Sequence, residues 1–293
     1  MQQQTESGTT RSKAKFEVVP ISSALGAEIR GVDLSRADAA AVKAIRDAWL
    51  EHVVLLFRDQ DLSDDALADF SRNFGDLDLA PPMETSQGAT HPEILIVSNV
   101  KEGGKAIGTL GDGEAIWHSD MNYMEAPPTG SLLYSLEVPP AGGDTGFCNM
   151  YKALDTLPAD IRRRIDGLSI KHDSSTNSGG YLRQGSKPVD DVRTCPGAVH
   201  PMVCTHPETG RKSLFIGRRR HAYIMGLPLA ESEKLLDAIW AHATRKELTW
   251  HHRWRVGDVL MWDNRCAMHR RDSFDPATRR LMHRTQIKGS KPS

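Results

Sequence analysis

Short apolar segments alternate with turns rich in glycine and proline through most of the chain, and this pattern predicts a β-rich core. Each apolar run is far shorter than the roughly 20 residues that a membrane-spanning helix needs. The segments that we expect to be strands are 53–58, 94–99, 130–139, 145–150, 168–172, 200–206, 212–217, 247–254, 258–264 and 280–288.

Helices are expected in four places between these strands. Segment 39–51 carries Val42, Ile45 and Trp49 at helical spacing. Ser63 can cap a second helix that ends near Gly75. Segments 151–166 and 229–244 predict two more helices. Many short strands with few helices between them favour a mostly β fold with flanking helices, a sandwich or jelly roll, over a doubly wound sheet. Two polar stretches, 101–114 and 174–191, are expected to be loops that cover a site.

Composition narrows the class of protein. The chain has 293 residues, of which 39% are hydrophobic and 26% are charged, as in ordinary globular proteins. The net charge of −1 gives no basic excess for binding nucleic acid or a membrane surface. The four cysteines form no C-x-x-C pair, so we expect reduced thiols in a cytoplasmic protein. Residues 1–15 lack an apolar stretch, so we expect a disordered segment there and no signal peptide.

The first chemical signal is the H-x-D motif of His118 and Asp120. In an extended strand the two side chains point to one face and can converge on an ion. Such a motif occurs about once by chance in a chain like this one, so alone it also fits a surface pair. His269 lies far downstream, and a jelly roll brings distant strands face to face. Two histidines and one carboxylate form the facial triad of non-haem Fe(II) sites, whereas catalytic zinc is usually four-coordinate.

A second signal is the segment 280–288, in which Arg280, Met282, Arg284 and Gln286 share one face of the expected strand. If this face points into the barrel, two buried guanidinium groups require anions. A dicarboxylate co-substrate and an anionic substrate would supply them. The alternation alone equally allows both arginines to face solvent.

Several blocks of the sequence, in order, resemble the taurine/2,4-dichlorophenoxyacetate dioxygenase (TauD/TfdA) family of Fe(II)/2-oxoglutarate enzymes. The resemblance covers roughly residues 16–290 and implies a single domain over residues 16–293, built on a double-stranded β-helix (a cupin-like jelly roll). The blocks are LGAEIRGVDL from residue 25, LLFRDQDLSDDALADFSRNFG from 55, WHSDMNY from 117, PPAGGDTGFCNM from 139, HPETGRKSLFIG from 206 and GDVLMWDNRCAMHRRDSFDPATRRLMHRTQIKG from 257.

The resemblance implies roles for five residues. His118, Asp120 and His269 fall on the iron ligands of the family. Thr145 falls on the threonine that hydrogen-bonds the distal carboxylate of 2-oxoglutarate, and Arg280 falls on the arginine that pairs with this carboxylate. The cofactor set implied is Fe(II), with 2-oxoglutarate and O2 as co-substrates.

The implied reaction is hydroxylation of a C–H bond, often with loss of a leaving group, as 2-oxoglutarate gives succinate and CO2. Arg284 falls on the arginine that often meets the acid group of the substrate, and Tyr123 is expected to line the pocket. Glu114 stands where taurine-specific members carry asparagine, which argues against taurine. The expected substrate is a small organic anion: an aryloxyalkanoate-like carboxylate, a sulfonate or a sulfate ester. The family also implies a homo-oligomer, a dimer or a tetramer.

Two alternatives remain at this point. A metal-dependent hydrolase or isomerase on a cupin-like barrel would use the triad without 2-oxoglutarate, but it gives no reason for Thr145 and Arg280. A catalytically silent barrel would bind a ligand or partner, although such a protein would usually have lost a metal ligand. Turnover of 2-oxoglutarate that depends on oxygen separates these alternatives from the dioxygenase.

Overall fold

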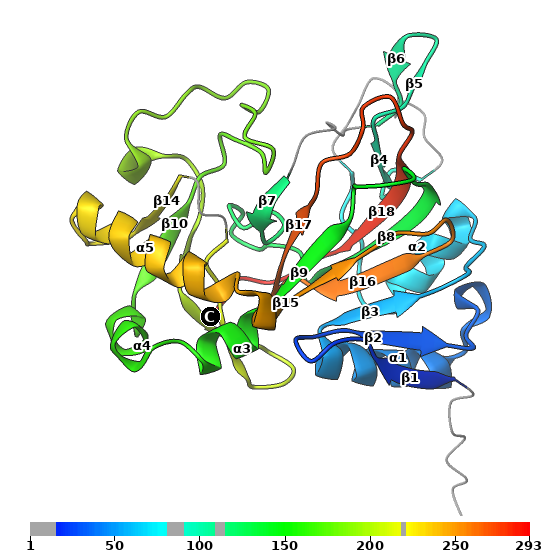
Figure 1. The fold of residues 1–293 in the computed structure, drawn as a ribbon, viewed down its shortest axis with the longest axis horizontal. Coiled ribbons are helices and arrows are strands. Elements are labelled where there is room, and N and C mark those ends of the chain that lie inside the picture. The colour runs from blue at the N-terminus through cyan, green and yellow to red at the C-terminus, as the bar shows by residue number, and fades with distance from the viewer. Residues whose placement is uncertain (1–15, 81–90, 109–114, 218–220) are drawn as a thin grey trace, which may run out of the picture.

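The computed structural model describes residues 16–80, 91–108, 115–217 and 221–293 (Figure 1). The segment 1–15 and Glu114, both the subject of predictions above, lie outside the described residues.

Two antiparallel sheets form the centre of the molecule, apart from one parallel pair, β2 with β3 (Figure 1). The larger sheet has the order β1-β2-β3-β16-β8-β18-β4. Its strands are β1 (Glu17–Pro20), β2 (Ala27–Arg30), β3 (Val54–Phe57), β4 (Leu95–Ser98), β8 (Gly130–Glu137), β16 (Val259–Asp263) and β18 (Leu281–Ile287). The smaller sheet has the order β15-β9-β17-β7. Its strands are β7 (Ala115–His118), β9 (Thr145–Asn149), β15 (Thr249–His252) and β17 (Ala267–Arg271).

Short sheets and helices surround this pair of sheets. The short strands are β5 (Lys101–Glu102), β6 (Lys105–Ala106), β10 (Ser169–His172), β11 (Val199–Pro201), β12 (Val203–Thr205), β13 (Lys212–Leu214) and β14 (Ala222–Ile224). The helices are α1 (Ala39–His52), α2 (Asp64–Arg72), α3 (Met150–Asp155), α4 (Ala159–Ile165) and α5 (Leu229–Ala243), with 3-10 turns η1 (Leu34–Arg36), η3 (Val192–Thr194) and η4 (Lys246–Leu248). None of the helices in the described ranges is both long and apolar enough to cross a membrane.

Three apolar clusters hold the layers together. One lies between the larger sheet and the helices α1 and α2, and Leu55 of β3 belongs to it. A second lies between the two sheets, and Leu56, the next residue, belongs to that one. The third lies between the smaller sheet and α3 and α5. Because β3 and β16 are covered on both faces, nearly all of their residues are apolar, which is why the hydrophobic pattern predicted both strands.

Local sequence explains where the first helices begin. Asp38 caps α1 by accepting a hydrogen bond from the backbone N–H of Ala41. Ser63 caps α2 in the same way, through the N–H of Ala66, as predicted.

The predicted single helix over 151–166 is wrong. The structure has two helices there, α3 and α4, and Pro158 stands at the start of the second. Proline lacks the N–H that a continuing helix needs, and it disfavours helical backbone in the residue before it.

Two other expectations need correction. The predicted loop 101–114 begins with a β5–β6 hairpin that turns at Gly103 and Gly104, both with positive φ. The predicted strand 200–206 is divided into β11 and β12. The prediction also lacked five strands: β1, β2, β7, β14 and β17.

Candidate metal centre and active site

The two histidines of the candidate triad face each other across neighbouring strands. His118 ends β7, His269 lies in the middle of β17, and the two are direct partners in the β7–β17 register. Directly opposed residues on paired strands have neighbouring side chains, and these ring centroids are 4.2 Å apart. Residues 151 positions apart in the chain are thus held together by the hydrogen bonds of the sheet.

The orientation of the His118 ring is fixed by its own strand. Its Nδ1 lies 2.7 Å from the carbonyl oxygen of Ile116, so Nδ1 carries the proton and donates it. The other ring nitrogen, Nε2, then faces Asp120, whose Oδ1 is 3.8 Å away. Such a hydrogen bond on the far side of the ring is the usual support of a metal-binding histidine.

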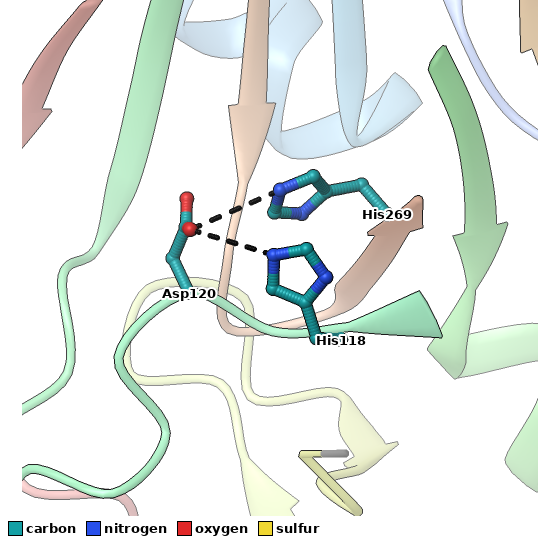
Figure 2. Close-up of side chains that lie close together, drawn as sticks. All are labelled: His118, Asp120 and His269. Carbon is teal, nitrogen blue, oxygen red and sulfur yellow. Dashed lines mark ion pairs between the residues drawn. The ribbon is translucent and has the colours of Figure 1, made fainter. Parts of the chain in front are cut away.

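Asp120 joins the two rings from a turn, not from a strand. β7 ends at His118, so the expectation that both residues of the H-x-D motif share an extended strand is wrong. The carboxylate nevertheless converges on the rings: Oδ1 lies 3.8 Å from Nε2 of His118 and 3.8 Å from Nε2 of His269 (Figure 2). All three donor atoms lie within 4.8 Å of one another. Two imidazole nitrogens and one carboxylate oxygen are a donor set that fits Fe(II).

Residues of the larger sheet hold the carboxylate from its other side. Ser131 of β8 donates to Oδ2 of Asp120 at 3.2 Å. Arg284 of β18 donates through Nη1 to Oδ1 at 3.3 Å and lies 3.5 Å from Oδ2. The candidate centre is therefore placed between the two sheets, with one histidine pair from the smaller sheet and the carboxylate anchored to the larger one.

The charges of the site suit a bound cation. Burial alone would raise the pKa of Asp120, but the Arg284 guanidinium and the rings of His269 and His118 lower it to about 2. Burial, followed by the proximity of His118, lowers the pKa of His269 to about 3. At neutral pH the carboxylate is thus ionised and the His269 imidazole is neutral, which are the forms that bind metal ions.

Arg280 is a buried cation whose guanidinium lacks a protein counter-ion among the described residues. It lies just before β18, it is 1% exposed, and its Nε and Nη1 atoms have no hydrogen-bond partner. Burial, followed by the charge of Arg271, lowers the pKa of Arg280 to about 9, so the side chain is still charged at neutral pH. A buried guanidinium without a counter-ion destabilises the folded protein unless an anion binds to it. The alternative in which Arg280 faces solvent is wrong.

Thr145 lies at the start of β9, two residues after Gly143, whose backbone comes close to this guanidinium. A methyl group at Gly143, two residues earlier, would lie 3.4 Å from Nε of Arg280, so the backbone here passes directly over the arginine. The Thr145 hydroxyl accepts a hydrogen bond from Nε1 of Trp254 at 2.9 Å. Its own proton is then directed elsewhere, so the hydroxyl can donate to a carboxylate.

Two candidates remain among the described residues, Arg284 and Tyr123. Arg284 contacts Asp120, as described, and its Nη2 donates to Oε1 of Gln286 at 3.1 Å. Tyr123 is half-buried beneath Arg183 of the 174–191 segment, whose Cζ lies 4.5 Å from the ring centroid. The structure thus brings a residue of one expected covering loop onto the turn that follows the triad motif.

Sequence reasoning missed the residues that orient the site. Ser131 and Trp254 each bond a predicted site residue, but neither belongs to a short motif near its partner. Trp254 could have been found only through the resemblance of the surrounding block, because a lone tryptophan fits a core position equally well.

The donor set of the triad and the buried Arg280 guanidinium fit a metal-dependent enzyme that binds an organic acid. The sequence over residues 17–286 matches the family described as "Taurine catabolism dioxygenase TauD, TfdA family", and the chain belongs to this family. It is an Fe(II)- and 2-oxoglutarate-dependent dioxygenase, which sets aside the hydrolase, isomerase and silent-barrel alternatives.

Three known proteins illustrate the similarity. The (S)-phenoxypropionate/alpha-ketoglutarate-dioxygenase of Sphingobium herbicidovorans is 34% identical over 95% of this chain and 96% of its own. The alpha-ketoglutarate-dependent 2,4-dichlorophenoxyacetate dioxygenase of Cupriavidus pinatubonensis is 36% identical over 90% of this chain and 95% of its own. A solved structure described as a putative alpha-ketoglutarate-dependent taurine dioxygenase from Burkholderia xenovorans superposes with a TM-score of 0.78, at 33% identity, over 95% of this chain and 91% of its own.

Proposed function

We propose that His118, Asp120 and His269 hold Fe(II), and that Arg280 and Thr145 bind the distal carboxylate of 2-oxoglutarate. The observation that carries this assignment is the buried Arg280 guanidinium, with two nitrogen atoms that lack a partner, in a fold that also assembles the triad. When bound, Fe(II) and 2-oxoglutarate supply the chemistry that uses O2 to hydroxylate a C–H bond and releases succinate and CO2.

The residues of the chain position the reactants around this chemistry. The triad would hold the metal through three protein donors and leave coordination positions for the co-substrate and O2. Arg280 and Thr145 fix the far end of 2-oxoglutarate, while Trp254 holds the Thr145 hydroxyl. Arg284, next to Asp120, binds the acid group of the substrate and so presents a neighbouring C–H bond to the metal.

The substrate that we propose is an aryloxyalkanoate-like carboxylate. Two similar relatives are named for phenoxypropionate and 2,4-dichlorophenoxyacetate, and Arg284 offers a guanidinium that matches a carboxylate. Tyr123, beneath Arg183, is proposed to line the pocket for the aryl ring. Glu114, outside the described residues, remains a candidate for the same pocket, and sulfonates and sulfate esters are the other anions to test.

The proposal extends to the fold and the assembly. The seven-stranded and four-stranded sheets, packed through one apolar cluster, support a double-stranded β-helix within a single domain over residues 16–293. We propose that the protein works in the cytoplasm, in agreement with four buried cysteines that form no C-x-x-C pair. A homo-oligomer is proposed from the family resemblance.

The proposed function is tested by measuring succinate release with Fe(II), O2 and 2-oxoglutarate across a panel of small organic acids. We expect turnover with aryloxyacetates and aryloxypropionates above the background without substrate. The methyl ester of each acid serves as the control, because it keeps the shape and removes the charge. Equal turnover of acid and ester would contradict the proposed anion site, and the absence of substrate-dependent succinate from every acid would contradict the substrate class.

Replacing Arg284 by glutamine is expected to lower kcat/KM for the acid substrate about 10- to 100-fold, since a charged hydrogen-bonded pair is worth about 1.5–3 kcal/mol. The KM for 2-oxoglutarate should change far less. Steady-state succinate assays on the acid and its methyl ester make the comparison. The ester provides the internal control, and an equal loss for both substrates would show that Arg284 acts on the metal centre alone.

A further inference from the structure

The turn between β16 and β17 contains an asparagine that holds the backbone of Asp120. Asn264 is 1% exposed, and its Oδ1 accepts a hydrogen bond from the backbone N–H of Asp120 at 2.7 Å. Its Nδ2 donates to the carbonyl oxygen of the same residue at 3.0 Å and to that of Pro128 at 3.0 Å. Both backbone polar groups of Asp120 are therefore bonded to one side chain from 144 positions away.

Asp120 needs such support because it lies in a strained turn. The next residue, Met121, has a φ of +47°, a left-handed conformation that is unfavourable for a residue with a side chain. Strained backbone of this kind persists only where the surroundings determine it. With β7 ended at His118, no ladder of strand hydrogen bonds fixes the direction of the Asp120 side chain.

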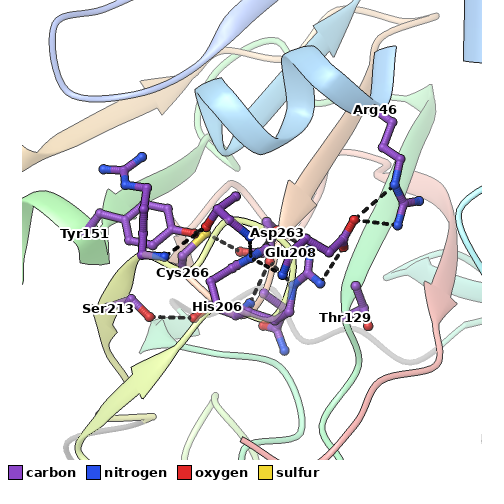
Figure 3. Close-up of polar contacts among 12 residues, drawn as sticks. Arg46, Thr129, Tyr151, His206, Glu208, Ser213, Asp263 and Cys266 are labelled. Carbon is purple, nitrogen blue, oxygen red and sulfur yellow. Dashed lines mark hydrogen bonds and ion pairs between the residues drawn. The ribbon is translucent and has the colours of Figure 1, made fainter. Parts of the chain in front are cut away.

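The asparagine is itself held by an ion-pair network. Asp263, the preceding residue, accepts hydrogen bonds from Arg265 through both oxygens and from Nε2 of His206 at 2.9 Å. Arg265 also donates to Glu208 at 2.8 Å, and Glu208 accepts from Arg46 of α1 (Figure 3).

This network is an anchor rather than a second metal site. His206, Asp263 and Cys266 lie close enough to suggest a metal cluster. However, Nδ1 of His206 already accepts hydrogen bonds from the backbone N–H groups of Glu208 and Thr209, and its Nε2 is used by Asp263. Burial raises the pKa of the Cys266 thiol well above its usual value, which disfavours the thiolate that a metal would need.

From these contacts we infer that Asn264 is a positioning residue that aims the Asp120 carboxylate at His118 and His269 and thereby sets the metal affinity of the site. The inference rests on the proposed role of Asp120 as a metal ligand. The amide is suited to this task because its Oδ1 accepts from the N–H of Asp120 while its two Nδ2 protons reach the carbonyl groups of Asp120 and Pro128; a hydroxyl has only one proton, and a methyl group makes none of these bonds. The ion pairs that connect this turn to α1 restrict the movement of the Asn264 amide, and the amide in turn holds the backbone of Asp120.

The test is a titration of the full-length, metal-free protein with Co(II), without 2-oxoglutarate, followed by visible absorption and calorimetry. Replacing Asn264 by alanine is expected to weaken Co(II) binding about 10- to 100-fold, the usual cost of losing a residue that orients a metal ligand. The milder Asn264→Ser should shift the affinity in the same direction by less. Because serine leaves a smaller cavity, this variant carries the test if the alanine variant does not fold.

Asn149 provides a matched control. It is also a buried asparagine, 6% exposed, and it bonds the backbone of Ala24 and Lys152 at the end of β9 opposite to Thr145. Asn149→Ala should lower the unfolding temperature and leave the Co(II) affinity unchanged. If Asn264→Ala instead keeps wild-type Co(II) affinity while losing as much stability as Asn149→Ala, Asn264 has only a structural role and the inference is wrong.

Asp120→Asn separates this failure from a failure of the proposed function. If the wild type binds Co(II) and Asp120→Asn loses this binding, the metal assignment stands whatever the Asn264 variants do. If Asp120→Asn binds Co(II) like the wild type, the metal assignment itself fails, and the inference about Asn264 fails with it.

Discussion

Replacing Arg280 by methionine is expected to raise the KM for 2-oxoglutarate about 100-fold, as the loss of a charged pair worth about 3 kcal/mol predicts. Arg280 is 1% exposed, and two nitrogen atoms of its guanidinium have no protein partner. Water therefore competes little with a carboxylate that binds there, and the bond between the two charged groups is strong. Co(II) affinity measured without 2-oxoglutarate should remain unchanged, because Arg280 does not contact the triad in the described contacts. Steady-state kinetics and a metal titration on the same preparation measure both quantities.

Two comparisons sharpen the Arg280 experiment. Arg279→Ala removes the neighbouring arginine, which is exposed and pairs with Glu137, and should leave the KM unchanged. A 2-oxo acid that lacks the distal carboxylate should lose little further activity in Arg280→Met. An unchanged KM for 2-oxoglutarate, or an equal loss with both 2-oxo acids, would contradict the assignment.

Arg280→Met should also affect the stability of the folded protein in the absence of ligand. A buried charge without a counter-ion destabilises the folded state, and methionine keeps much of the side-chain volume. The ligand-free Arg280→Met protein should therefore unfold at the same temperature as the wild type or at a higher one. A calorimetric scan checks this, and a clear decrease would indicate that the guanidinium stabilises the free protein through contacts of its own.

The sequence pattern predicted most of the larger sheet because hydrophobic burial decides it. Strands such as β3 and β16 are covered on both faces, so nearly every residue in them is apolar. β17 was missed because it carries His269 and two arginines, and its strand conformation comes from pairing with β7 and β9 rather than from its own composition. Polar residues at a site break the hydrophobic pattern by which a strand is recognised, so a strand such as β17 is hard to predict from its sequence.

The site was predictable to the extent that it depends on residue type. The H-x-D motif and the arginine strand could be read directly, and the structure brings His118, Asp120 and His269 together. The turn that carries Asp120 could not be read, because it depends on Asn264, far along the chain. Long-range hydrogen bonds to the backbone leave no periodic pattern in the sequence. The residues that position the reactive groups of a site are therefore harder to predict than the reactive groups themselves.

Asp120→Asn should have the largest effect on the metal centre. The substitution keeps the shape of the side chain and removes the negative charge that faces His118, His269 and Arg284. We expect metal affinity to fall by at least about 100-fold, beyond the usual cost of losing a supporting residue, and substrate-dependent succinate formation to be abolished. Co(II) titration measures the first effect, and succinate release at saturating Fe(II) measures the second.

Asp258→Asn is the matched control for this experiment. Asp258 is likewise a fully buried carboxylate that bonds an arginine and a histidine, Arg58 at 2.6 Å and His252 at 3.0 Å. Breaking this buried ion pair should lower the free energy of unfolding by about 3–5 kcal/mol without changing Co(II) affinity. If Asp120→Asn retains succinate formation, or if both variants lose metal affinity alike, loss of a ligand does not explain the effect, and the carboxylate of Asp120 does not bind the metal.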